Sequence, residues 1–109
     1  MTNALPEMQA IVREHRGLAI LRALQREVSH GANEEVMRAW LDLVALGGTR
    51  EVVRAELDRL AGLGVIQVEW RGFAGETKVF WLTEKGLDYL EFRTAVEDLP
   101  RIGPANTPY

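Results

Sequence analysis

Residues 47–70 read GGTREVVRAELDRLAGLGVIQVEW, and the spacing of their apolar side chains changes part-way along. Thr49 has a hydroxyl that can cap a helix, and Glu51 follows in the first turn, where the helix dipole favours a carboxylate. Three apolar residues then recur at helical spacing: Val53, Leu57 and Leu60. Two glycines can supply the left-handed backbone that ends a helix: Gly62 and Gly64. This pattern predicts a helix over residues 49–62.

After this helix the apolar residues recur at every second position, which is typical of a half-buried β-strand. Three side chains fall on one face of the strand: Ile66, Val68 and Trp70. Residues 71–76 contain two glycines and indicate a loop, and a second apolar segment follows the loop. The pattern predicts strands over residues 65–70 and 78–82, joined as a hairpin.

Another helix is predicted immediately before residue 47. Asn33 can cap it, and two glutamates follow in its first turn. Apolar residues continue at helical spacing, so the helix is expected over residues 33–46, and only two glycines separate it from the next one. A helix, a short glycine-bearing turn and a second helix form a helix-turn-helix. The hairpin that follows makes this a winged helix-turn-helix with a two-stranded wing.

The segments on either side are predicted to be helical as well. An N-terminal helix is expected over residues 6–29, with Gly17 as a candidate position for a bend or a break. The part before Gly17 is an extension beyond a minimal winged helix, and it either pairs with a second subunit or packs on its own domain. A C-terminal helix is expected over residues 83–97, followed by an extended tail over residues 98–109 with three prolines. The fold class is therefore α+β, mostly α, with one domain over residues 1–97.

The composition is that of an ordinary globular domain. The chain has 109 residues, of which 47% are hydrophobic and 27% are charged. There is no cysteine, which excludes disulfides, thiolate zinc sites and cysteine nucleophiles and fits a reducing compartment. No apolar run reaches the roughly 20 residues that span a bilayer, and the N-terminus lacks a signal-peptide pattern. We therefore expect a cytoplasmic protein without a membrane partner.

Residues for catalysis are scarce. His15 and His30 are the only histidines, and no serine or carboxylate stands at a spacing typical of an activated nucleophile. The glycines mark helix ends and the hairpin loop and match no phosphate-binding motif. We therefore expect no enzyme activity, no metal, no cofactor and no small-molecule effector.

Basic residues on the 49–62 helix and on the hairpin indicate double-stranded DNA as the partner. Arg50, Arg54 and Asp58 are spaced by four and share one outer stripe of the helix. Residues near the start of such a helix contact base edges in the major groove, and helix amides and hydroxyls anchor phosphates. The predicted DNA-binding residues are Thr49, Arg50, Arg54, Arg59, Arg71 and Lys78. A homodimer reading two half-sites is the expected form.

The charge of the chain favours a second interpretation. The net charge is −3, whereas DNA-binding domains are usually basic because they neutralise phosphates. Arg54 can pair with Asp58 four residues further on, and Arg50 with a neighbouring carboxylate, which would leave only a solvated face. If acidic neighbours tie up Arg50 and Arg54, or a second subunit covers them, the DNA-binding interpretation fails while the fold prediction stands. The alternative function is a protein-interaction module with the same fold.

The positions of four aromatic side chains predict their environments. Trp40 is expected in the core, because it lies on the apolar surface of the 33–46 helix. Phe73 lies at the tip of the hairpin and is expected to fold back on Trp70 or Trp81. Both of these tryptophans lie on strands and are expected to cover the sheet.

Four short motifs, in this order, resemble small winged-helix proteins encoded by Mu-like prophages. They are HRGLAILRAL at 15–24, the cap Asn33, TREVVRAELDRL at 49–60 and LTEKGLD at 82–88. The resemblance covers about residues 10–103, and each motif alone is degenerate. It implies a phage-encoded transcriptional regulator or, alternatively, a role in phage packaging or assembly. It also implies a short proline-bearing tail that can cross to a partner subunit.

Overall fold

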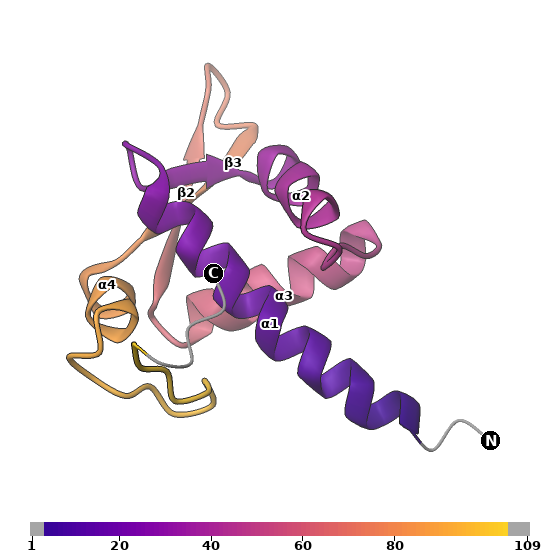
Figure 1. The fold of residues 1–109 in the computed structure, drawn as a ribbon. Helices are drawn as coiled ribbons and strands as arrows, with labels where there is room; N and C mark the ends of the chain where they lie inside the picture. Colours follow the sequence, from indigo (N-terminus) through magenta and orange to yellow (C-terminus); the bar gives the residue numbers. More distant parts are fainter. Residues whose placement is uncertain (1–3, 105–109) are drawn as a thin grey trace.

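The computed structural model describes residues 4–104, which form four helices and a three-stranded antiparallel sheet (Figure 1). The elements in chain order are α1 (Ala4–Arg26), β1 (Gly31–Asn33), α2 (Glu34–Leu43), α3 (Arg50–Gly62), β2 (Ile66–Arg71), β3 (Thr77–Leu82) and α4 (Glu84–Leu90). The strand order is β1-β3-β2, so β3 is the central strand. The predicted α+β class is confirmed. None of the helices in this part of the chain is both long enough and apolar enough to cross a membrane.

The predicted hairpin forms from β2 and β3, and strand β1 adds a third strand that was not predicted between the first two helices. It pairs antiparallel with β3, with Gly31 opposite Trp81 and Asn33 opposite Val79. A Cβ at Gly31 would lie 2.3 Å from the Trp81 ring, so only glycine allows the two strands this close. Three residues are too few to show an alternating pattern, and this is why the strand was not predicted.

Helix α1 is continuous and does not bend or break at Gly17. Gly17 is buried, and a Cβ there would lie 2.6 Å from Oε2 of Glu56 on α3. The glycine therefore allows a close approach of two helices rather than a kink. The helix ends at Arg26 instead of residue 29, and its N-terminal part runs out from the rest of the molecule (Figure 1).

Helix α2 ends at Leu43, three residues before the predicted boundary at 46. Ala45 has a positive φ of 60°, its N–H donates to the Asp42 carbonyl (3.2 Å), and the Leu46 N–H donates to the Leu41 carbonyl (2.8 Å). These bonds form a Schellman motif, which usually has glycine at the left-handed position. The prediction relied on glycine as the end signal and therefore placed the boundary too late.

Helix α4 ends at Leu90 instead of residue 97, because Phe92 adopts the same left-handed conformation with φ 64°. The chain then turns back, and Val96 is buried in the core. The Tyr89 hydroxyl donates to the Pro100 carbonyl (2.5 Å), and burial raises the pKa of Tyr89 to about 12. The first part of the predicted extended tail, up to residue 104, therefore packs on its own domain. The rest of the predicted tail lies outside the described residues.

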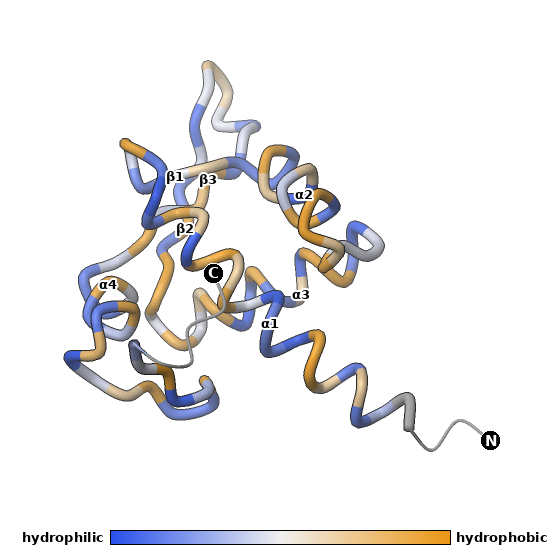
Figure 2. The backbone as a smooth tube through the Cα atoms, in the orientation of Figure 1, coloured by the Kyte–Doolittle hydropathy of each residue, from blue (hydrophilic) through white to orange (hydrophobic). Residues whose placement is uncertain are grey.

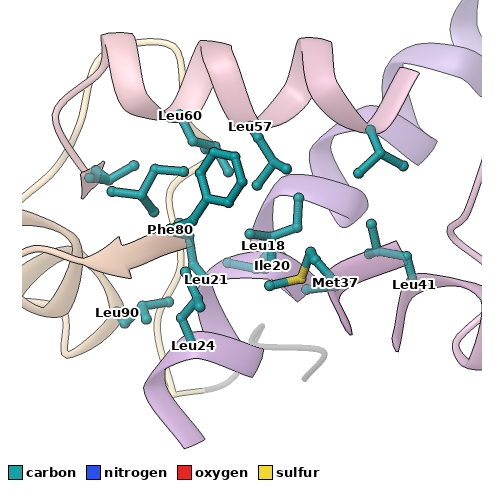
Figure 3. Close-up of a cluster of buried hydrophobic side chains, with 14 of the residues drawn as sticks. Leu18, Ile20, Leu21, Leu24, Met37, Leu41, Leu57, Leu60, Phe80 and Leu90 are labelled. Atoms are coloured by element: carbon teal, nitrogen blue, oxygen red, sulfur yellow. The ribbon is translucent and has the colours of Figure 1, made fainter. Parts of the chain in front are cut away.

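The core lies between the helices and the sheet. Figure 2 shows apolar and polar positions alternating along α2 and α3, as expected of helices with one buried face, whereas residues 16–22 of α1 are all buried. Figure 3 shows side chains from every helix and from β3 meeting in one cluster. The labelled side chains are Leu18, Ile20, Leu21, Leu24, Met37, Leu41, Leu57, Leu60, Phe80 and Leu90. Burying each of them stabilises the fold by about 1.5–3 kcal/mol. Trp40 packs against this cluster, in agreement with the prediction.

Candidate nucleic-acid interface

Helix α3 presents one face to the core and the opposite face to solvent. Val53, Leu57 and Leu60 are buried as predicted, whereas Arg50, Arg54 and Asp58 are exposed. Thr49 caps the helix, because its hydroxyl accepts a hydrogen bond from the Val52 N–H (3.2 Å). The cap fixes where α3 begins and therefore which side chains lie near its N-terminus.

Both arginines of the outer face pair with the first turn of α2. Arg54 Nε lies 2.7 Å from Oε1 of Glu34, and Arg50 Nε lies 3.9 Å from Oε2 of the same carboxylate. Arg50 Nη2 also lies 3.4 Å from Oε1 of Glu35. The expected pair between Arg54 and Asp58 does not form; Asp58 pairs with Lys78 of β3 (3.9 Å). The arginines therefore link α3 to α2.

Burial distinguishes the partners in this cluster. The side chains of Arg50 and Arg54 are 49% and 54% exposed, and that of Glu35 is 69% exposed, but that of Glu34 is only 13% exposed. The hydrogen bond to Glu34, reinforced by its charge, raises the pKa of Arg54 further above its ordinary value. Arg54 therefore keeps its positive charge at any physiological pH, and about half of each arginine is accessible to a ligand.

The β2–β3 hairpin, residues 66–82, contributes two further cations. Arg71 lies over the Trp81 ring (5.0 Å to its centroid) and pairs with Glu69 (3.3 Å). Lys78 lies 5.7 Å from the centroid of the Trp70 ring, in addition to its pair with Asp58. Like the two arginines of α3, each of these cations has a carboxylate partner. The positive charge of the predicted interface is therefore neutralised within the chain.

Phe73, at the tip of the hairpin, is fully exposed. The prediction that it folds back on a tryptophan is therefore wrong. Gly72 and Gly75 have positive φ angles, and the Ala74 N–H donates to the Glu76 carboxylate (2.9 Å). This compact turn directs Phe73 away from the sheet. Trp70 is also largely exposed rather than covering the sheet, so the hairpin carries two aromatic side chains in solvent.

A cleft of about 640 Å³ separates α2, α3 and the hairpin. It is lined by Asn33, Glu34, Glu35, Arg50, Arg54, Trp70, Glu76, Thr77 and Lys78. Three of the predicted DNA-binding residues therefore meet here, together with three glutamates. Arg71 and Thr49 are not part of the lining. The cleft is balanced in charge rather than basic.

Arg59 does not line the cleft, and its guanidinium bonds to groups of its own domain. Its Nε and Nη2 donate to the two carboxylate oxygens of Glu56 (3.1 and 2.6 Å), and its Nη1 donates to the Asp98 carbonyl (3.1 Å). Glu56 is only 3% exposed and lies against Gly17 of α1. The hydrogen bond to Glu56 raises the pKa of Arg59. Arg59 therefore joins α3 to the segment after α4.

Two of the three buried charged residues in the described part of the chain, Glu56 and Arg16, join neighbouring elements, and neither role was predicted from the sequence. Glu56 follows Val53 by three positions and precedes Leu60 by four, so its spacing placed it on the buried stripe. Arg16 is buried on α1, and its Nε donates to the Leu46 carbonyl (2.7 Å). Its Nη2 donates to the Gly47 carbonyl (3.2 Å). Arg16 thus holds the link between α2 and α3 in place, and no local spacing signal indicates that role.

The chain matches no protein-family model, no curated protein and no solved structure. The resemblance to the prophage proteins therefore stays an expectation.

Proposed function

We propose that the chain is a winged helix-turn-helix protein that binds double-stranded DNA, with α3 as the recognition helix and the β2–β3 hairpin as the wing. The outer face of α3 carries the proposal. Arg50 and Arg54 stand one turn apart near the start of this helix, and about half of each side chain is exposed. A helix placed this way presents its N-terminal side chains to base edges and its first amides to phosphates.

Arg50 and Arg54 both pair with acidic neighbours, which counts against DNA binding, and the proposal depends on the half of each side chain that stays exposed. The Arg50–Glu35 pair joins two exposed side chains, and such pairs contribute about 0–1 kcal/mol. A DNA phosphate can replace a carboxylate and accept bidentate, charge-assisted hydrogen bonds from arginine. Arg50, Arg54, Arg71 and Lys78 are the proposed contacts, with Thr49 and the α3 amides as anchors. Arg59 is left out of this set because its guanidinium is bonded to Glu56 and Asp98.

A second copy of the chain is part of the proposal. Met8 and Ile11 are exposed on the projecting part of α1, and a groove of about 780 Å³ lies between that part and α3. A two-fold dimer requires a self-complementary surface, and one chain here supplies both an exposed helix and an adjacent groove. Pairing would double the DNA contacts and set two α3 helices on half-sites about 34 Å apart.

Selection from a random-sequence duplex library tests the proposal, followed by fluorescence anisotropy on the enriched duplex. Three or four phosphate contacts per subunit give about six to eight for a dimer. Affinity should then fall by about 10³-fold or more between 50 and 200 mM salt. Failure to enrich any duplex, or an affinity that does not change with salt, would contradict DNA binding.

A protein partner is the second candidate function, and the hairpin favours it. Trp70 and Phe73 are large, exposed aromatic side chains next to a cleft of balanced charge. Such anchors commonly dominate the free energy of protein interfaces. The prophage resemblance would assign such a partner to phage packaging or assembly. Trp70→Ala with Phe73→Ala would then abolish capture of the partner, whereas Arg50→Ala with Arg54→Ala would not.

A further inference from the structure

The carboxylate of Glu34 is surrounded by groups that also bind phosphate. Guanidinium groups from two successive turns of α3 lie on either side of it, 2.7 Å away for Arg54 and 3.9 Å away for Arg50. Glu34 is also the first residue of α2, where the helix dipole favours negative charge. Arginine pairs and helix N-termini are the two common protein sites for phosphate oxygens.

We infer that Glu34 is an internal competitor for the DNA backbone, occupying the position that a phosphate takes in the complex. This inference rests on the proposed DNA binding. A phosphate that displaces Glu34 leaves its carboxylate, which is only 13% exposed, without a cationic partner. A single anion cannot offset that loss, whereas a duplex that also contacts the hairpin and the amides of α3 can. Glu34 thereby lowers the affinity for isolated anions and for non-cognate DNA.

Glu35 provides a matched comparison on the same turn of α2. Its carboxylate also pairs with Arg50, at 3.4 Å, but it is 69% exposed. Solvent and salt screen an exposed charge much more than a covered one. Removing the charge at position 34 should therefore strengthen DNA binding more than removing it at position 35.

The variants Glu34→Gln and Glu35→Gln keep the size of the side chain and remove one charge each. We expect Glu34→Gln to bind the same duplex about tenfold more tightly than the unaltered chain, and Glu35→Gln to change the affinity by no more than about threefold. The helix cap at Asn33 is retained in both variants, and thermal unfolding checks that both are folded. Fluorescence anisotropy at one fixed salt concentration gives the affinities.

A third variant, Glu34→Gln combined with Arg54→Ala, separates competition from a general change in net charge. The gain in DNA affinity from Glu34→Gln should disappear when Arg54 is absent, because Arg54 is the guanidinium that the substitution releases for phosphate. Equal affinities for Glu34→Gln and the unaltered chain, or a gain that persists without Arg54, would overturn the role of Glu34 and leave DNA binding intact. Absence of DNA binding in all variants would overturn the proposed function and this inference together. Binding by Glu34→Gln alone would support both.

Discussion

The carboxylate of Glu56 accepts two hydrogen bonds from Arg59, at 3.1 Å from Nε and 2.6 Å from Nη2, while remaining almost entirely buried. A buried carboxylate depends on its partner, because its charge is costly away from water. Removing the arginine leaves that charge unpaired between α1 and α3.

Arg59→Ala should therefore lower the free energy of unfolding by about 3 kcal/mol. Urea denaturation measures this change. Arg26→Ala, at the exposed end of α1, is the control and should cost less than about 0.5 kcal/mol. A similar small effect at position 59 would show that the pair with Glu56 contributes nothing to stability.

The double substitution Arg50→Ala with Arg54→Ala should weaken DNA binding at least about 100-fold and lower the slope of log affinity against log salt. The slope should fall by about four for a dimer, because two contacts are lost in each subunit. Anisotropy titrations at several salt concentrations measure both quantities. Arg26→Ala, away from the interface, should leave the affinity and the salt slope unchanged. An unchanged slope for the double variant would mean that DNA binds at another surface.

Gly31→Ala should destabilise the fold by about 1–3 kcal/mol, since the new Cβ would lie 2.3 Å from the Trp81 ring and separate β1 from β3. Gly62→Ala is the matched control, because a Cβ at this helical position meets no atom within 4 Å. It should stabilise the chain by about 0.5–1 kcal/mol through helix propensity. Thermal unfolding of the two variants should therefore shift in opposite directions. A shift in the same direction would contradict the tight packing at Gly31.

Tyr89 should make stability depend on pH in the alkaline range. Its pKa of about 12 lies above the value of roughly 10 for an exposed tyrosine, so the folded state retains a proton that the unfolded state releases. This contribution, about 3 kcal/mol, is complete below pH 10 and is lost as the pH rises to 12. Tyr89→Phe should remove that pH dependence and, by leaving the Pro100 carbonyl without its donor, lower stability by about 1 kcal/mol. Parallel denaturation curves for both chains above pH 10 would refute the assignment.

Met8→Glu with Ile11→Glu should convert the proposed dimer into a monomer, because both substitutions put charges into an apolar contact between copies. Sedimentation equilibrium measures the change in mass. Val28→Glu is the control, since Val28 is fully exposed beyond the end of α1. A monomeric unaltered chain at all concentrations would contradict the dimer.

Much of the fold could be predicted because it depends on local chemistry. Asn33, Thr49 and Thr83 each accept a hydrogen bond from an N–H three residues later. These residue types are typical helix caps, so the starts of three helices could be predicted from the sequence. Two of the helix ends were harder to predict, because Ala45 and Phe92 adopt the left-handed conformation that glycine usually takes.

The candidate site was predicted less well because its interactions are distant in sequence. Glu34 and Arg54 are twenty residues apart, and no periodic pattern connects them. Their distance depends on how α2 crosses α3, which is fixed by the packing of the whole core. Local spacing suggested Asp58 as the partner of Arg54, but the crossing of the helices brought Glu34 closer.

Strand β1 runs directly into α2, since Asn33 is both the last residue of the strand and the cap of the helix. The same strand is bonded to β3, which is one leg of the hairpin. The backbone hydrogen bonds of the sheet therefore connect the hairpin to the first turn of α2, which carries Glu34.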